Sequence, residues 1–447
     1  MSSHVNKLLA ALLFAGLLIG AGAVGVSRIS ETTPATAAGA LVIEPGLVAA
    51  TTGPPAADLD GLIAQLQTRL DVVPGDSVAW STLGLAYVQQ ARVTADPSFY
   101  PRADAALDRS VEVQPDDNFL ALAGRSALAS ARHEFGDAKT FAEQGLAVNA
   151  FSALLWGALS DAELQLGNYD AATEAVDQMI RLSPDTSSYS RASYLAELRG
   201  EIPLARSLME AALESAGQPS DQAFALTILG NLSFDSGEPG AALTQYNRAR
   251  SLAPGDVAAL AGKARAEAAL GQHLTALDHY AELVEVAPEP SFLIEYARLL
   301  ESLGRGDEAA AQYAVIDSVL AVFDANGVEL DAGPLLDLAE RGDPVVALAE
   351  SEQAVRVRPF LAIHDAHAWA LYANGRYDDA LLAVERAKET GASNARVAFH
   401  SGMIKLALGD RAGAREDLER AMEINPFFDP LDAVTVRTTL AELGGAS

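Results

Sequence analysis

Two histidines of this chain are close enough in sequence to share a metal ion. His364 and His367 are three residues apart, with Asp365 between them, so a helix would place both imidazoles on one side. Two imidazoles without a clear third ligand make a poor metal site, and residues at the start of a helix are the more ordinary interpretation. The chain has no HExxH sequence, no GxSxG nucleophile elbow, no phosphate-binding loop and no GxGxxG followed by a ribose-binding acid. The sequence therefore predicts neither an enzyme nor a metal or cofactor.

Polar side chains that recur at a fixed spacing offer a different chemistry, the binding of a carboxylate. Asn231, Arg265 and Arg298 are 34 and 33 residues apart. Two arginines in an acidic protein could receive a carboxylate or an acidic peptide. The alternative is that they pair with acids of the same chain, for which the candidates are Glu295, Glu301 and Asp235. A spacing near 34 residues requires a structural repeat that sets these side chains in line.

The amino-acid composition limits the classes of partner and of fold that the chain can have. The formal net charge of −29, with no run of Lys and Arg, disfavours nucleic acid and anionic lipid headgroups. The absence of cysteine excludes disulfides, thiolate metal sites and lipidation at a cysteine. Half of the residues are hydrophobic but only 6% are aromatic, which favours helices packed closely through small side chains.

A repeated unit of two helices accounts for the spacing near 34 residues. WSTLGLAY, which begins at Trp80, has the Trp-x2-Leu-Gly-x2-Tyr spacing of a first helix. The matching pattern of a second helix is an alanine followed four residues later by an aromatic. It occurs as Ala242 with Tyr246, Ala276 with Tyr280, and Ala309 with Tyr313.

Glycine and proline mark the same period independently. The intervals between successive turn glycines are 33, 37, 34, 33, 38, 33 and 34 residues. These glycines are Gly167, Gly200, Gly237, Gly271, Gly304, Gly342, Gly375 and Gly409. A residue just past a helix C-terminus often adopts the left-handed conformation, so the series predicts the turn inside each helix pair. Prolines that break helices between pairs are expected at Pro115, Pro184, Pro254, Pro288, Pro359 and Pro426.

With these motifs the chain from about Trp80 onward resembles a tetratricopeptide repeat protein. Stretches such as HDAHAWALYANGRYDDAL resemble tetratricopeptide proteins of the actinobacterial type, which are membrane-anchored or exported and have no assigned role. The resemblance implies an all-α, right-handed superhelical solenoid of antiparallel helix pairs whose first helices line a concave groove for peptides or partner proteins. The carboxylate-clamp set of Lys, Asn and Arg found in chaperone-binding members cannot be placed in this sequence.

The groove residues are predicted from the helical period. In each first helix the position after the signature glycine points away from the packing face. That position is occupied in turn by Leu85, Ala127, Asp161, Tyr194, Asn231, Arg265, Arg298, Leu336, Trp369 and Met403. The ligand candidates are Asp161, Tyr194, Asn231, Arg265, Arg298 and Trp369. For Trp369, with its neighbour Tyr372, the alternative is an ordinary place in the core.

The ends of the chain suggest an anchor and caps. Residues 1–28 include an uncharged stretch from Leu8 to Val26, long enough for a membrane anchor and also consistent with a cleaved signal peptide. Residues 29–57 form an Ala-, Thr- and Pro-rich flexible linker. Residues 58–429 are assigned to an array of about ten helix pairs, whose start a helix from Leu59 to Leu70 could cap. Residues 430–447 are assigned to a capping helix and tail, with Leu431, Val434 and Leu440 on the buried side.

These observations favour a scaffold of the bacterial cell envelope that holds a protein or peptide, with an acidic peptide among the candidates. The array would be membrane-anchored outside the cytoplasm, or secreted. The alternative is an envelope enzyme or carrier that binds a polysaccharide or small ligand in the groove, which would need paired carboxylates beside exposed aromatics.

Overall fold

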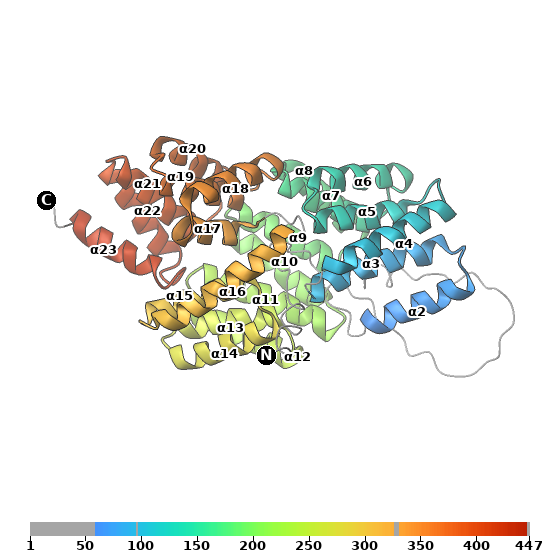
Figure 1. Ribbon diagram of the computed structural model, residues 1–447, viewed down its shortest axis with the longest axis horizontal. Coiled ribbons are helices and arrows are strands. Elements are labelled where there is room, and N and C mark those ends of the chain that lie inside the picture. Colours follow the sequence, from blue (N-terminus) through green and yellow to red (C-terminus); the bar gives the residue numbers. More distant parts are fainter. Residues whose placement is uncertain (1–58, 95–96, 326–329, 445–447) are drawn as a thin grey trace.

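Helices account for the regular structure throughout the part of the chain that the structure describes. The computed structural model describes residues 59–94, 97–325 and 330–444, so the predicted anchor or signal and the linker lie outside it (Figure 1). Within these ranges no residue lies in a strand. No helix there combines the length and the apolar character needed to cross a bilayer.

Antiparallel helix pairs follow one another along the chain. The pairs are α3 (Ser77–Thr94) with α4 (Tyr100–Val113), α5 (Phe119–Ala131) with α6 (Phe135–Val148), α7 (Ala153–Gln165) with α8 (Tyr169–Leu182), α9 (Thr186–Leu198) with α10 (Ile202–Ser215), α11 (Pro219–Asp235) with α12 (Pro239–Leu252), α13 (Val257–Ala269) with α14 (His273–Val286), α15 (Pro290–Ser302) with α16 (Gly306–Ala325), α17 (Ala332–Arg341) with α18 (Pro344–Val357), α19 (Leu361–Ala373) with α20 (Tyr377–Ala387), and α21 (Ala395–Ala407) with α22 (Arg411–Ile424). The helix predicted near Leu59 is α2 (Leu59–Val72), which packs on α3, and a 3-10 turn (Pro97–Phe99) precedes α4.

Polar caps and small residues explain why the pairs form. Asn118 and Asp256 begin α5 and α13 by accepting hydrogen bonds from Ala121 and Ala259 backbone N–H groups. Gly230 of α11 allows the Tyr246 ring of α12 to approach, since a β-carbon at Gly230 would lie 2.5 Å from the ring. The aromatic of the second-helix signature thus packs against a glycine of the first helix.

The predicted turn glycines take the left-handed conformation with one exception. Gly167, Gly200, Gly237, Gly271, Gly304, Gly375 and Gly409 have φ between 71° and 85°. Gly342 follows α17 as expected, but its φ is −90° and its ψ −153°, so the prediction of a left-handed turn is wrong there. The reason is local, because Gly342 is itself the C-cap of α17, whereas Gly167, for example, is the residue after the C-cap of α7.

The array curves until late repeats touch early ones. The Leu361 N–H donates to the Tyr169 hydroxyl, 192 residues away, at 3.0 Å. The Gly200 turn lies against Gly391, and a β-carbon at Gly200 would be 2.5 Å from the Gly391 carbonyl oxygen. We call α7–α15 the N-terminal arm and α17–α23 the C-terminal arm, and we call the contact between them the seam. Figure 1 shows α18 of the C-terminal arm beside α8 of the N-terminal arm.

An apolar cluster forms one end of the seam. Leu164 and Leu195 of the N-terminal arm pack with Leu335, Phe360 and Ile363 of the C-terminal arm. Burial of side chains of this size stabilises a structure by roughly 1.5–3 kcal/mol each, so the cluster fastens the two arms firmly.

The last helix caps the array, but one of the residues predicted on its buried side is exposed. Helix α23 (Asp432–Gly444) buries Ala433, Val436 and Leu443, and Leu440 is partly buried against the same cluster, whereas Val434 is exposed. The prediction counted Leu431 as helical, but the helix begins one residue later, and the face that repeats every three to four residues is set by Ala433 and Val436.

Candidate functional site

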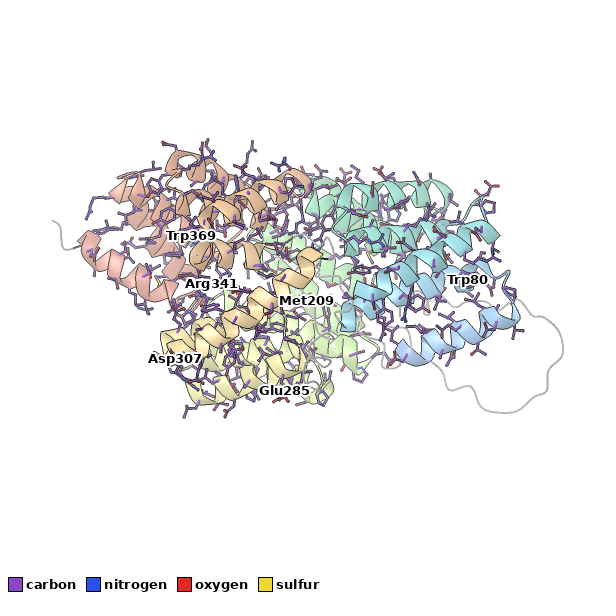
Figure 2. All side chains as sticks on the ribbon, in the orientation of Figure 1. Trp80, Met209, Glu285, Asp307, Arg341 and Trp369 are labelled. Atoms are coloured by element: carbon purple, nitrogen blue, oxygen red, sulfur yellow. The ribbon has the colours of Figure 1, made fainter. Side chains whose placement is uncertain are left out.

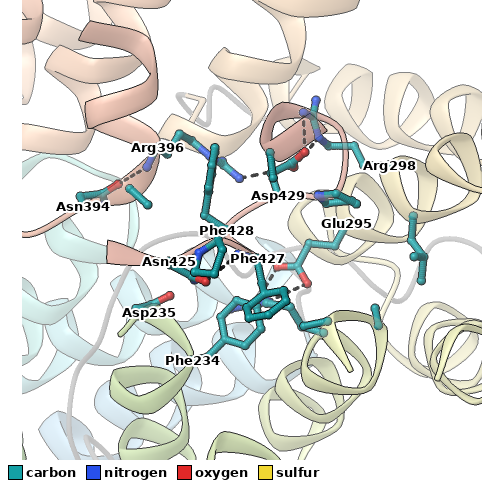
Figure 3. A pocket seen from close by; sticks show the side chains of 18 of the residues that line it. Phe234, Asp235, Glu295, Arg298, Asn394, Arg396, Asn425, Phe427, Phe428 and Asp429 are labelled. Atoms are coloured by element: carbon teal, nitrogen blue, oxygen red, sulfur yellow. Dashed lines mark hydrogen bonds and ion pairs between the residues drawn. The ribbon is translucent and has the colours of Figure 1, made fainter. Parts of the chain in front are cut away.

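A cavity of about 680 Å³ lies where the two arms face each other. Its N-terminal-arm wall is made by the C-terminal ends of α9, α11, α13 and α15, and its opposite wall by the start of α21, the loop before α23, and α23 itself (Figure 3). Among the predicted groove residues, Arg265, Arg298 and Leu336 line it. The helical period therefore places part of the predicted groove on the walls of this partly open cavity.

Arg265 is paired with an acid of its own arm. Its Nη2 and Nε atoms donate to the two Glu295 oxygens at 2.7 and 3.2 Å, and the Tyr280 hydroxyl donates to the same carboxylate at 2.9 Å. The guanidinium also lies 5.4 Å from the centre of the Phe234 ring. Glu295 was one of the intramolecular partners considered from the sequence.

Arg298 is shared by three carboxylates, and two of them come from the far end of the chain. Nε and Nη2 donate to Asp429 Oδ2 and Oδ1 at 2.6 and 2.9 Å, and Nη2 lies 2.8 Å from Asp432 Oδ1. Nη1 contacts Glu340 of α17. We call these four residues the Arg298 cluster. None of the three acids was predicted as a partner, because Asp429 is 131 residues away in sequence.

Asp429 and Asp432 of the Arg298 cluster have pKa values shifted in opposite directions. Burial raises the pKa of Asp429, but the charge and hydrogen bonds of Arg298 outweigh this and hold the pKa below its ordinary value. Burial and the neighbouring Asp429 charge raise the pKa of Asp432 to about 6. The single positive charge of Arg298 therefore cannot neutralise all of the carboxylates around it. The next cation is Arg396, whose Nη2 atom is 3.8 Å from Asp429 Oδ2.

Two carboxylates on the cavity wall have no partner. Glu197 is the next-to-last residue of α9 and Asp235 the last of α11, and neither side chain has a hydrogen bond or ion pair with any described residue. Burial, then the charge of Asp235, raises the pKa of Glu197 to about 8. Burial also raises the pKa of Asp235, although Arg265 opposes the shift. The Asp235 side chain is exposed to the cavity but lies deep among protein atoms.

The position of these acids is unfavourable for the helices that carry them. A helix C-terminus carries a partial negative charge, so an acid there is normally disfavoured by about 0.3–1 kcal/mol. Neighbouring first helices nonetheless end in unpaired acids on the same cavity. In the sequence, these acids stand two or three residues before the turn glycines Gly200 and Gly237. That spacing could have indicated the site, but the groove prediction did not include it.

The opposite wall adds an aromatic ring and cations. Phe427 is 39% exposed and Phe428 is half-buried beside it (Figure 3). Asn394 accepts hydrogen bonds from the backbone N–H groups of Arg396 and Val397, which starts α21 and directs Arg396 toward the loop at Asp429. The cavity thus joins an unpaired acidic wall to a basic and aromatic one.

The other predicted ligand residues lie outside the cavity. Asp161 is buried and paired with Arg191, and Asn231 accepts a hydrogen bond from the Tyr246 hydroxyl at 2.7 Å. Tyr194 belongs to the apolar seam cluster, and burial raises its pKa. Trp369 lies within the C-terminal arm (Figure 2), where its ring stacks on Tyr372 at 4.6 Å and on His400 at 4.2 Å. The structure therefore brings Arg265 and Arg298 together and places the other four elsewhere.

The histidine pair serves packing contacts. His367 Nδ1 lies 3.0 Å from Ser351 Oγ, and burial lowers the pKa of both His364 and His367. Across the described ranges, no group of three or more His, Asp or Glu side chains is arranged to hold a metal ion.

The solved structures that are similar to this chain share little sequence identity with it. Yeast Tom70 is 14% identical, with a TM-score of 0.38 over 86% of this chain and 93% of that chain. A human IFIT1 dimer with PPP-AAAA is 14% identical, with a TM-score of 0.44 over 80% of this chain and 77% of that chain. The APC/C hetero-tetramer Cut9-Hcn1 is 13% identical, with a TM-score of 0.39 over 86% and 93%.

Comparison with family models gives the repeat type. No curated protein sequence matches the chain. The tetratricopeptide repeat model matches residues 122–187, 229–288, 261–318 and 366–427. These stretches coincide with helix pairs on both sides of the cavity. The chain contains tetratricopeptide repeats, arranged as an all-helical array.

Proposed function

We propose that the chain is a scaffold that binds a protein or peptide partner, and that basic side chains of the partner enter the cavity between the arms. The observation that carries the proposal is the pair of unpaired carboxylates, Glu197 and Asp235, on the cavity wall. Lysine or arginine would supply the missing counter-charge and donate hydrogen bonds to both acids. The raised pKa of Glu197 is the expected consequence of an acid without such a partner.

The charge of the whole chain supports a basic partner. A formal net charge of −29 attracts cationic segments at long range and speeds their encounter. An acidic peptide, which the sequence also suggested, would have to displace Glu295 from Arg265 or Asp429 from Arg298. A basic segment meets no such competition at Glu197 and Asp235.

The volume of the cavity limits what can enter. About 680 Å³ is within the range of ~300–1,000 Å³ that is usual for ligand pockets, and it accommodates a few side chains of an extended segment. The same volume favours a second candidate function, a carrier for a small cationic ligand, because Phe427 offers an aromatic face on the wall opposite the acids. We propose no catalytic step and no cofactor for either function.

We further propose that the array stands outside the cytoplasm, anchored or exported by residues 1–28. The support is the sequence alone, namely the uncharged stretch from Leu8 to Val26 followed by a Pro-rich linker. A cell-envelope location would make secreted or membrane proteins the natural partners of the scaffold.

Site-specific photo-cross-linking tests the proposed function. Benzoylphenylalanine in place of Phe427 would sit in the cavity, and the same residue in place of Phe151, which is 83% exposed and distant from the cavity lining, is the matched control. We expect a protein that cross-links from position 427 in cells, does not cross-link from 151, and is lost in the Glu197→Gln/Asp235→Asn variant. Cross-links that are equal at both positions, or that survive the charge variant, would argue against the proposal. A low-mass cation retained by the purified chain in native mass spectrometry would instead support the carrier.

A further inference from the structure

We propose that the Arg298 cluster is a latch that holds the two walls of this partly open cavity together, and that the cavity widens for its partner when α21–α23 swing away from α11–α15. Only the identity of what enters rests on the function proposed above. The latch itself rests on the different nature of the contacts at the two ends of the seam.

One end of the seam is apolar and wide. There Leu164 and Leu195 pack against Phe360 and Ile363, and the Leu361 N–H donates to Tyr169. Separating this end would expose the side chains of a shared core, which is costly. We therefore assign this end of the seam as the hinge.

The other end is held by charge at few points. Arg298 is 12% exposed and Asp429 4%, and together with Asp432 and Glu340 they tie α15, α17 and the start of α23 together. The turn at Gly237 also meets the C-terminal arm at this end, where a β-carbon would lie 3.2 Å from the Ile424 carbonyl oxygen. A bidentate guanidinium pair is directional, so a small displacement removes most of its hydrogen bonding at once. Such a contact suits a latch, since it is either made or broken.

The cavity is built from both sides of this latch. Glu197, Asp235 and Arg298 belong to the N-terminal arm, whereas Arg396 and Phe427 belong to the C-terminal arm. Rotation about the hinge would separate these walls and open the acids to an entering chain. The loop from Asn425 to Asp432, which carries Phe427 and Asp429, would move as the lid.

The latch also contains carboxylates that a basic partner could use. Three acids share one guanidinium, so cationic side chains that approach the cavity compete with Arg298 for Asp432 and Glu340. Groups that face the cluster from its surroundings are Arg396 of α21 and Asp337 of α17. Binding of a basic segment would in this way favour the open arrangement.

Spin-label distances measure the opening without knowledge of the partner. Because the chain has no cysteine, cysteines can be introduced in pairs for labelling. Glu285→Cys on α14 with Glu442→Cys on α23 reports the latch end, and Asp177→Cys on α8 with Glu350→Cys on α18 reports the hinge end. All four side chains are exposed. The full-length chain is measured as wild type, Arg298→Ala, Asp432→Asn and Arg305→Ala.

We expect Arg298→Ala to lengthen the mean latch distance by at least about 5 Å, one helical turn, while the hinge distance stays unchanged. Asp432→Asn is isosteric and keeps Arg298, so it serves if Arg298→Ala fails to fold, and we expect a smaller shift in the same direction. Arg305→Ala removes an arginine paired within its own helical turn with Glu308, and it should change neither distance.

Two results would overturn the latch. The first is an unchanged latch distance in folded Arg298→Ala and Asp432→Asn, which would leave the proposed function intact. The second is wild-type protein that binds a peptide of alternating lysine and alanine without any shift of the latch distance. An opening in Arg298→Ala combined with no binding of this peptide to any variant would support the latch and count against the proposed basic partner.

Discussion

Asp161 of α7 and Arg191 of α9 form a buried bidentate ion pair between neighbouring repeats. Arg191 Nε and Nη2 donate to the two Asp161 oxygens at 2.9 and 2.8 Å, and Nη1 donates to the Ser187 carbonyl at 3.2 Å. Asp161 is 8% exposed, and burial raises its pKa against the opposing charge of Arg191. A position chosen from the sequence as a ligand contact is therefore part of the packing between repeats.

Removal of one member of this pair should destabilise the array strongly. Asp161→Ala leaves an arginine charge buried without its partner, which typically costs about 3–5 kcal/mol in the free energy of unfolding. Asp161→Leu combined with Arg191→Met removes both charges and should recover most of that loss. Urea denaturation followed by circular dichroism gives the two free energies. Equal stability of the single and double variants would show that the pair is not coupled.

Gly200 and Gly271 form a matched pair that reports on the seam. Both have positive φ, so alanine costs each about 1 kcal/mol for backbone strain, but only Gly200 abuts the other arm, at Gly391. Gly200→Ala should therefore be less stable than Gly271→Ala by a further ~1–3 kcal/mol. Thermal unfolding of the two variants measures the difference, and identical melting temperatures would mean that the arms do not meet in solution.

Gly230 and Gly240 test the packing within one repeat. A β-carbon at Gly230 would lie 2.5 Å from the Tyr246 ring, whereas nothing lies within 4 Å of one at Gly240 in the same repeat. Gly230→Ala should lose about 1–3 kcal/mol, and Gly240→Ala should be neutral or gain up to about 1 kcal/mol from helix propensity. Chemical denaturation separates the two, and a stable Gly230→Ala would contradict the packing of Tyr246 against α11.

Glu289 makes stability fall as the pH rises. This side chain is 3% exposed without a hydrogen-bond or ion-pair partner among the described residues, and burial raises its pKa to about 9 from the ordinary 4.5. Between these pH values the folded chain holds a proton that the unfolded chain releases. The contribution of Glu289 to the free energy of unfolding is therefore full below about pH 4.5 and lost by about pH 9. Glu289→Gln should match wild type at pH 5 and exceed it by about 1 kcal/mol or more at pH 9. Denaturation curves of wild type and variant at pH 5 and pH 9 test this prediction. A gain in stability that is the same at both pH values would refute it.

The local structure could be predicted because it depends on local chemistry. A turn glycine such as Gly167 or Gly271 ends the first helix of its repeat. The aromatic of the second-helix signature, such as Tyr246, packs within its own helix pair. The same argument failed at Gly342, which is itself the C-cap of α17, and at Val434, which lies on the exposed side of α23.

The cavity could not be predicted because it depends on how tightly the array curves. A small rotation per repeat adds up over many repeats before Leu361 meets Tyr169, and no periodic signal reports that sum. Arg265 and Arg298 could be predicted as groove residues because they follow the helical period of the first helices. Asp429, their unexpected neighbour, lies in a loop, and Glu197 and Asp235 lie at helix ends where the groove position is not counted.

Calorimetric titration of a peptide of alternating lysine and alanine into the full-length chain tests the proposed binding site most directly. The wild type should bind it, more tightly at pH 9 than at pH 7 because Glu197 becomes ionised near pH 8. Glu197→Gln/Asp235→Asn should bind at least about tenfold more weakly, as expected for lost charge-assisted hydrogen bonds. Equal affinity of wild type and variant, or binding of the matched glutamate and alanine peptide in place of the basic one, would contradict the assignment of this cavity to a basic partner.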